Sequence, residues 1–151
     1  MTRNLIFDFG KVLVDYDFEV FFHKYIPDEE RFQDFLPVLY NETVQQLLDR
    51  EEKPFEEIMD GIISNNRKFE KEIRIFCEQY PELVTNEIKG MRELLQKLKS
   101  EGFRLYGLTN WCSKVYHTMS QFEIFNLLDG IHHLFRGTCH QTRASHLQAV
   151  V

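Results

Sequence analysis

The stretch from Leu5 to Asp17, "LIFDFGKVLVDYD", decides the fold of this chain. It consists of an apolar run, a break at Asp8-Phe9-Gly10-Lys11, and a second apolar run. A short apolar run followed by Asp-x-Gly predicts a central β-strand that ends in a turn. We therefore expect Asp8 at the carboxyl end of that strand.

A second strand is predicted over residues 103–110, "FRLYGLTN", which ends at Thr109 and Asn110. Residues 86–102 directly before it predict a helix, because apolar residues recur there at helical spacing. These apolar residues are Ile88, Met91, Leu94, Leu95 and Leu98. Gly102 is a natural cap for the end of this helix. A strand, a helix and a second strand in this order predict a parallel sheet.

The residues between these two regions, from Phe18 to about Tyr80, have helical spacing and many aromatic side chains. They predict three or four short helices, with Thr43 and Gln46 as a capping box and Pro54 as a first helical residue. The aromatic residues expected to form the core of this segment are Phe18, Phe21, Phe22, Tyr25, Phe32 and Phe35. The chain is thus predicted to be an α/β protein with an all-helical cap inserted after its first strand.

Composition indicates one soluble globular core and excludes two classes of partner. The chain has 151 residues, of which 43% are hydrophobic, and a formal net charge of −6. Its scattered Lys and Arg residues give no basic patch for nucleic acid. It has no apolar run of the roughly 18 residues that would span a membrane. The opening residues have too short an apolar run for a secretory signal, so a cytoplasmic protein is expected. Cys77, Cys112 and Cys139 lack any C-x-x-C pairing, which indicates reduced thiols.

The two predicted strand ends indicate a shared site. In open α/β sheets, ligands bind outside the carboxyl ends of the strands. Asp8 and Thr109 are therefore expected to face one pocket, although they are far apart in the chain. Taken singly, each residue also suits an ordinary turn or helix start, so the functional interpretation depends on their convergence.

The two stretches together resemble a known superfamily. "LIFDFGKVLVDYD" resembles the first motif of the haloacid dehalogenase superfamily, and "GFRLYGLTNWCSKVY" with "FEIFNLLDGI" resembles its second motif and the helix that follows. The resemblance covers residues 4–17 and about 88–131. It implies a Rossmann-like core formed by residues 1–15 and 88–131, a small helical cap over residues 16–87, and an aberrant tail over residues 132–151.

The resemblance implies a phosphatase site with Asp8 as its nucleophile. Asp8 would attack phosphorus to form an aspartyl-phosphate, and would hold Mg²⁺ together with the backbone carbonyl of Gly10. Thr109, with Asn110 beside it, would bind the transferring phosphoryl oxygens. The chemistry also demands a cation, since a carboxylate attacks phosphorus well only when charge on the approaching oxygens is neutralised. The expected substrate is a small phosphate ester such as a sugar phosphate.

Lys11 and Trp111 are further candidates for substrate binding. Lys11 stands where the superfamily commonly has a small residue. It could reach a phosphate, and an ordinary solvated lysine is the alternative. Trp111 could line the substrate site or pack against the cap. The nearby acids Asp15 and Asp17 are interpreted as solvated.

The sequence departs from the superfamily pattern in two ways. Gly10 stands where the phosphatases usually carry a second Asp that protonates the leaving group, so leaving groups that depart readily are favoured. The third and fourth motifs, a lysine and a pair of acidic metal ligands, do not follow Ile131. We therefore expect a core without its C-terminal half and an impaired enzyme, because each lost electrostatic stabiliser costs about 10²–10³ in rate.

Four other interpretations compete with the phosphatase. A 2-haloacid dehalogenase of the same superfamily would also use an aspartate nucleophile, but would attack carbon without a metal. A non-catalytic, truncated fragment is favoured by the missing later motifs. A protein kinase, suggested by Asp8-Phe9-Gly10, fails because its other motifs should precede this one. A cysteine nucleophile at Cys112 has no evident basic partner.

The residues after Ile131 differ in composition from the rest of the chain. They contain four of the six histidines and no acidic residue. A zinc site would use His132, His133, Cys139, His140 and His146, whose spacing is not that of common zinc sites. In a frame shifted by one base, codons for "HQTRASHLQAVV" are compatible with Ile-Lys-Pro and a later Ile-Tyr, which resembles the third motif at the family spacing. We therefore interpret these residues as a frame-shifted form of that motif.

Overall fold

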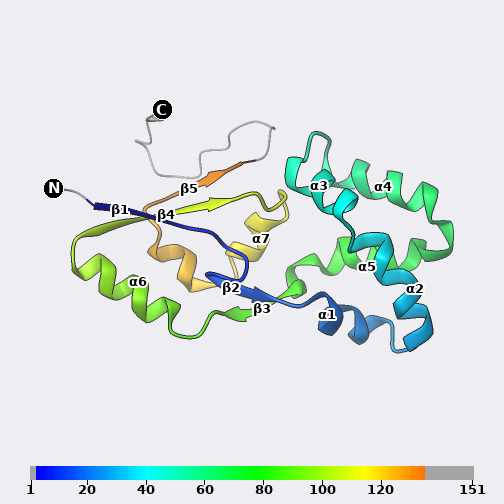
Figure 1. Ribbon diagram of the computed structural model, residues 1–151, viewed down its shortest axis with the longest axis horizontal. Helices are drawn as coiled ribbons and strands as arrows, with labels where there is room; N and C mark the ends of the chain where they lie inside the picture. Colours follow the sequence, from blue (N-terminus) through cyan, green and yellow to red (C-terminus); the bar gives the residue numbers. More distant parts are fainter. Residues whose placement is uncertain (1–2, 135–151) are drawn as a thin grey trace.

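The computed structural model describes residues 3–134 and has a mixed α/β fold, which confirms the predicted class (Figure 1). The strands are β1 (Arg3–Phe7), β2 (Val14–Tyr16), β3 (Val84–Glu87), β4 (Phe103–Thr109) and β5 (Gly130–His133). The α-helices are α1 (Phe18–Tyr25), α2 (Glu29–Leu39), α3 (Glu42–Arg50), α4 (Phe55–Asn65), α5 (Glu70–Gln79), α6 (Met91–Ser100) and α7 (Val115–Met119). Three short 3₁₀ helices are η1 (Arg67–Phe69), η2 (Tyr80–Leu83) and η3 (Glu123–Leu127).

A three-stranded parallel sheet with the order β1-β4-β5 forms one half of the molecule. Leu5 of β1 lies opposite Leu105 of β4, and Gly107 of β4 lies opposite Ile131 of β5. The prediction that the first strand is central is wrong for the described residues, because β1 pairs with β4 alone and forms an edge. Ile6 on this strand is 66% exposed, as expected where no described element covers it.

One face of the sheet is covered by α6, α7 and η3 (Figure 1). Leu105, Gly107 and Thr109 alternate toward this buried face, which is the pattern of a half-covered strand. Gly107 packs so closely that a Cβ there would lie 2.5 Å from Cε1 of Phe9. This contact holds the turn after β1 against the central strand.

The helix predicted over residues 86–102 exists as α6 but begins later, at Met91. Residues up to Glu87 pair instead with β2, and the backbone N–H of Ile88 donates to the carbonyl of Leu13. Leu95 is buried as predicted, whereas Leu94 is 42% exposed. Gly102 has a φ of 84°, the left-handed conformation that suits a residue just beyond a helix.

The helical insertion, which we define as Phe18–Leu83, forms the other half of the molecule and contains five α-helices rather than the predicted three or four (Figure 1). The predicted capping box at Thr43 is also wrong. Asn41 caps α3 instead, because its side chain accepts a hydrogen bond from the N–H of Val44 at 3.0 Å. Pro54 directly precedes α4, one residue from its predicted place.

The helical insertion has its own aromatic core, which confirms the predicted cluster. Phe21, Phe22, Phe32 and Phe35 are buried in it, and Phe18 and Tyr25 pack against it. A second core lies under the sheet and includes Phe9, Leu105 and Ile124. Tyr16 and Trp111 pack against both cores and therefore lie at the junction of the two halves.

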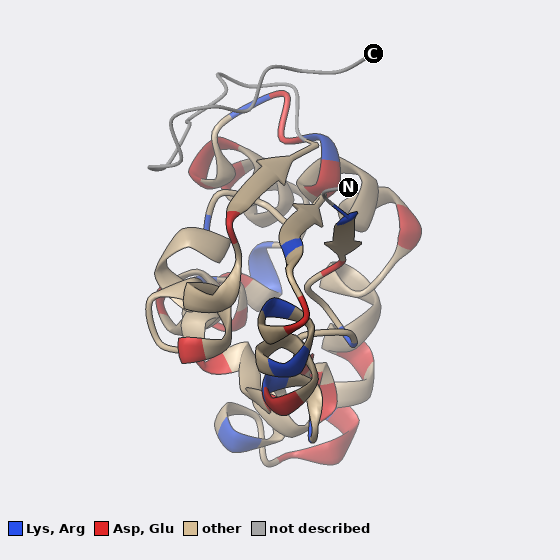
Figure 2. Cartoon of the chain, turned by 90° about the vertical axis from the view of Figure 1, so that its left-hand side faces the viewer, with Lys and Arg blue, Asp and Glu red and all other residues tan. Residues whose placement is uncertain are grey.

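The chain enters and leaves the helical insertion through the antiparallel ribbon of β2 and β3. At the entrance, the Asp17 side chain caps α1 by accepting from the N–H of Val20 at 2.9 Å. The Asp17 N–H donates to the carbonyl of Leu83 at 3.4 Å, which ties the entrance to the exit. No helix within residues 3–134 is long and apolar enough to cross a membrane. Figure 2 shows that basic and acidic residues are interspersed over the described part of the chain.

Candidate active site

A pocket of about 210 Å³ lies where the carboxyl ends of β1 and β4 meet the helical insertion. Five of the six predicted site residues line it: Asp8, Gly10, Thr109, Asn110 and Trp111. The sixth, Lys11, does not line it. The convergence expected of the two strand ends is therefore present in the structure.

The sheet supplies the wall that holds Asp8 and Thr109. Asp8 follows β1 directly, and its Oδ1 accepts a hydrogen bond from the N–H of Phe9 at 2.7 Å. Thr109 ends β4 and is buried, and its hydroxyl oxygen accepts from the N–H of Trp111 at 3.1 Å. The Thr109 hydroxyl hydrogen is thus directed away from that bond and can donate to a ligand.

Lys11 is engaged outside the pocket. Its ammonium donates to Oδ1 of Asp15 at 2.6 Å and to the carbonyl of Tyr16 at 2.5 Å. The hydrogen bond with Asp15 raises the pKa of the Lys11 ammonium above its usual value. Lys11 also has a φ of 60°, a conformation that costs roughly 1 kcal/mol for a residue with a Cβ.

Tyr16 occupies the space that a side chain at position 10 would need. A Cβ built on Gly10 would lie 2.8 Å from Cε1 of Tyr16, closer than real Cβ atoms approach a neighbour. The Tyr16 ring is itself held by Trp111, with ring centres 5.7 Å apart. An Asp at position 10 is therefore incompatible with this arrangement unless Tyr16 moves.

Asp8 and the carbonyl of Gly10 are the groups that could hold a cation. The bridge between Gly10 and Val14 uses the N–H of Lys11 and the carbonyl of Phe9, so it does not use the Gly10 carbonyl. Mg²⁺ commonly binds one or two carboxylates together with substrate phosphate and water. The pair fits such a partial shell, although residues 3–134 contain no group of three or more His, Cys, Asp or Glu that could form a complete one.

The helical insertion contributes Asp49, which the sequence did not single out as a site residue. Asp49 lies near the end of α3, lines the pocket and is half-buried. Burial raises the pKa of its carboxyl group, and a hydrogen bond with the Asn110 side chain partly opposes this. The sequence around Asp49 shows only an acidic residue near a helix end. Asp49 could not be predicted as a site residue, because it lines the same pocket as Asp8 only in the folded chain.

Two further contacts hold the helical insertion against the loop after β4. Glu51 has a left-handed φ of 39° and is buried. Its carboxylate accepts two hydrogen bonds from Ser113, one from the backbone N–H at 2.7 Å and one from the Ser113 hydroxyl at 2.5 Å. Lys114 forms an ion pair with Glu56 at 2.7 Å. In each contact, the glutamate follows Asp49 in the sequence and its partner follows Asn110. The two contacts therefore connect the two segments that carry these pocket residues.

Cys112 lines the pocket but is a poor nucleophile. Its thiol is buried and donates to the Tyr80 hydroxyl at 3.4 Å. Burial raises the pKa of the thiol to about 11, so it is protonated at neutral pH. The structure therefore agrees with the expectation that no basic group activates Cys112.

The first two residues of the predicted tail continue β5. His132 and His133 pair with Leu108 and Thr109 of β4. Burial lowers the pKa of His133, whose ring lies 4.6 Å from that of Tyr116. The zinc hypothesis also involves Cys139, His140 and His146, which lie outside the described residues. The frame-shift hypothesis depends on residues 140–151, which lie outside them as well.

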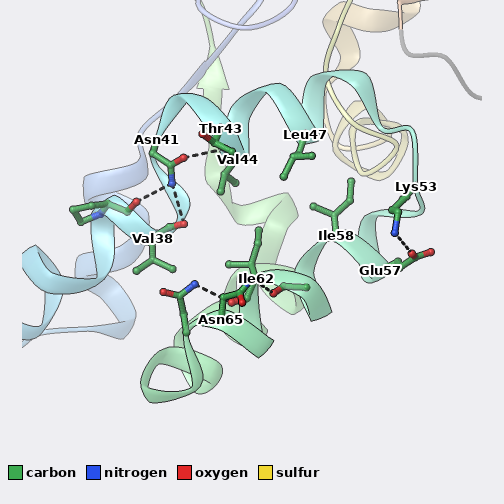
Figure 3. Close-up of a pocket in the computed structure, with 13 residues that line it drawn as sticks. Val38, Asn41, Thr43, Val44, Leu47, Lys53, Glu57, Ile58, Ile62 and Asn65 are labelled. Carbon is green, nitrogen blue, oxygen red and sulfur yellow. Dashed lines mark hydrogen bonds and ion pairs between the residues drawn. The ribbon is translucent and has the colours of Figure 1, made fainter.

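A larger groove of about 620 Å³ lies on the helical insertion (Figure 3). Its walls are mostly apolar and include Val38, Leu47 and Ile62. Its ionisable lining residues, Lys53 and Glu57, pair with each other at 2.6 Å. The groove thus offers no group suited to phosphoryl transfer, and the smaller pocket is the candidate active site.

No family model, curated protein or solved structure matches this chain. The geometry of the pocket and the motif resemblance are therefore the observations that bear on function.

Replacing Asp49 with Asn is expected to raise the melting temperature at about pH 7. Because burial raises the pKa of Asp49 above its ordinary 3.8, its charged form costs stability at neutral pH. The folded protein takes up this proton before the unfolded chain does, so the cost disappears as the pH falls toward 3.8. Thermal melts at several pH values should show a gain that shrinks with acidification. Asp60→Asn, on an exposed part of α4, is the matched control.

Proposed function

We propose that this chain is a Mg²⁺-dependent phosphohydrolase of the haloacid dehalogenase type, acting on a small phosphate ester such as a sugar phosphate. One observation carries the proposal: a single pocket joins Asp8 and Gly10 after β1 with Thr109 and Asn110 after β4. Such convergence of two strand ends is where open α/β sheets bind ligands. The free thiols of Cys77 and Cys112 support a reducing, cytoplasmic location.

The proposed reaction begins with in-line attack of an Asp8 oxygen on phosphorus. The Thr109 hydroxyl and the Asn110 amide donate to the phosphoryl oxygens, whose negative charge they stabilise. The leaving oxygen departs on the side opposite Asp8, toward the helical insertion. A pocket of about 210 Å³ suits a phosphate with a small organic group rather than a large ligand.

Asp8 and the Gly10 carbonyl would hold Mg²⁺ in this proposal. When bound, the cation neutralises negative charge as the carboxylate approaches the phosphate. The protein's own part is to aim the Asp8 carboxylate at phosphorus, and the hydrogen bond from the N–H of Phe9 fixes one of its oxygens.

Turnover by this chain is expected to be slow. Within residues 3–134, no Lys or Arg lines the pocket, so the phosphate charge is met there by Thr109 and Asn110 only. Losing one electrostatic stabiliser typically lowers the rate by about 10²–10³. Substrates that react readily, such as p-nitrophenyl phosphate or acetyl phosphate, are therefore the appropriate probes.

Phosphate release from p-nitrophenyl phosphate should require Mg²⁺ and stop when EDTA is added, because the attacking carboxylate needs the cation. Parallel assays with 2-chloropropionate test the dehalogenase alternative, which uses the same nucleophile on carbon. The proposal expects no chloride release. Metal-independent chloride release would favour the dehalogenase, and no product from either substrate would favour a non-catalytic fragment.

A further inference from the structure

We propose that Asp49 protonates the leaving group, taking the role that the resembled family gives to position 10. The inference rests on the proposed phosphohydrolase function. It assigns a catalytic residue from the helical insertion and broadens the expected substrates, because the sequence alone predicted an enzyme without a general acid.

Asp49 lines the pocket from a different part of the fold than the proposed nucleophile Asp8. Asp8 and Thr109 form the wall made by the sheet, and Asp49 belongs to the wall made by the helical insertion. In-line attack by Asp8 sends the leaving oxygen toward that second wall. Among the described residues of the helical insertion that line the pocket, Asp49 is the carboxylic acid. The negative charges of Asp8 and Asp49 both act on Tyr16, which shows that the two acids lie near one ring.

The usual position for the acid is closed in this chain. The Tyr16 ring fills the space beside Gly10, where a Cβ would lie 2.8 Å from Cε1. Tyr16 itself is a weak candidate for the acid, because burial raises the pKa of its hydroxyl group, and the nearby Lys11 ammonium only partly opposes this rise. General acid catalysis is most efficient when the pKa of the donor lies near the working pH. Burial shifts the pKa of the half-buried Asp49 carboxyl group upward, toward neutral pH, whereas it shifts the pKa of the Tyr16 phenol further above neutral pH.

The environment of Asp49 favours its protonated form. Burial disfavours the carboxylate, and the other titratable residues lining the pocket are Asp8, Tyr16, Tyr80 and Cys112. None of these is a cation, so none stabilises the charged form of Asp49. The Asn110 side chain hydrogen-bonds Asp49 and joins it to the proposed phosphate site.

The chemistry balances over two steps. In the first, an Asp8 oxygen bonds to phosphorus while the bond from phosphorus to the ester oxygen breaks. The ester oxygen keeps that electron pair and takes the Asp49 proton, and an alcohol leaves. In the second, Asp49 accepts a proton from the water that attacks phosphorus. The bond to Asp8 breaks, its electron pair returns to the Asp8 oxygen, and Asp49 is protonated again.

This assignment changes the expected class of substrate. With an acid present, esters of ordinary alcohols become substrates as well as esters of good leaving groups. Gln45 lines the pocket from the same helix as Asp49, and its amide can both donate to and accept from a hydroxyl group. The substrate class is therefore a small phosphate ester of a hydroxyl-bearing alcohol.

The test compares two esters that differ in leaving group. Nitrophenol leaves readily without a proton, whereas phenol benefits from one. Rates with Mg²⁺ are measured for p-nitrophenyl phosphate and phenyl phosphate in the wild type, Asp49→Asn and the exposed control Asp60→Asn. The ratio of the phenyl to the nitrophenyl rate should fall by about 10²-fold in Asp49→Asn and stay at the wild-type value in Asp60→Asn. Asp49→Glu, which keeps an acid, should restore part of the ratio.

An unchanged ratio in Asp49→Asn would overturn the assignment. A larger fall in Tyr16→Phe would overturn it too, by identifying the phenol as the donor. So would a wild type that releases nitrophenol but no phenol, because a competent acid keeps the two rates close. Circular dichroism establishes that each variant is folded. Hydrolysis that survives Asp8→Asn, or none in the wild type, contradicts the phosphohydrolase itself, and the role of Asp49 falls with it.

Discussion

Replacing Asp8 with Asn is expected to lower Mg²⁺-dependent phosphate release to the uncatalysed level. The amide oxygen is a poor nucleophile, and an amide cannot form the acyl phosphate that the proposed reaction requires. Asn has nearly the shape of Asp and can still accept the hydrogen bond from the N–H of Phe9, so the turn after β1 should keep its structure. The measurement is the rate of p-nitrophenol release at saturating Mg²⁺, with Asp8→Ala as a second variant.

Asp15→Asn is the matched control for this loss. Asp15 lies in the same stretch of sequence, pairs with Lys11 and does not line the pocket. It should therefore reduce turnover far less than Asp8→Asn. Turnover that persists in both Asp8 variants would remove Asp8 from its proposed role.

Replacing Phe22 with Ala is expected to cost about 3–5 kcal/mol of unfolding free energy, because it removes a large buried ring that the core cannot fully replace. Phe22 is fully buried, and its ring centre lies 4.8 Å from that of Phe35 and 5.8 Å from that of Phe76. Phe35 is on α2 and Phe76 on α5, so Phe22 joins three helices of the insertion. A typical domain is stable by about 5–15 kcal/mol, so this loss is a large fraction of the total.

Urea unfolding followed by circular dichroism gives the comparison. Val20→Ala is the control, since Val20 lies on the same helix and is 62% exposed. It should change stability by less than about 0.5 kcal/mol. A similar midpoint for Phe22→Ala and the wild type would contradict the packing of the helical insertion around this ring.

The local features of the fold could be predicted from the sequence because they depend on neighbouring residues. An apolar run followed by Asp8-Phe9-Gly10 and a second predicted strand ending at Thr109 and Asn110 were enough to place the ends of β1 and β4 and to expect Asp8 and Thr109 in one pocket. Helix starts were less certain, because several polar residues compete for each cap. Asn41 precedes Thr43 and accepts the hydrogen bond from the N–H of Val44, so α3 begins two residues earlier than predicted.

The features that sequence patterns missed depend on residues far apart in the chain. The edge position of β1 follows from which strands pair with it, which its own residues do not determine. The Tyr16 ring leaves no room for a side chain at Gly10, and Asp49 of α3 lines the same pocket as Asp8. Tertiary packing brings these groups together, and no local pattern in the sequence predicts that packing.

Chemical trapping of the phosphoenzyme tests the central claim most directly. The chain is incubated with acetyl phosphate and Mg²⁺, treated with borohydride, which reduces an aspartyl-phosphate to homoserine, and digested with trypsin. Cleavage after Arg3 and Lys11 releases the peptide Asn4–Lys11, in which Asp8 is the one acidic residue. The proposed mechanism predicts homoserine at position 8, dependent on Mg²⁺ and absent without acetyl phosphate. Phosphate release with an unmodified Asp8, or homoserine at another aspartate, would contradict it.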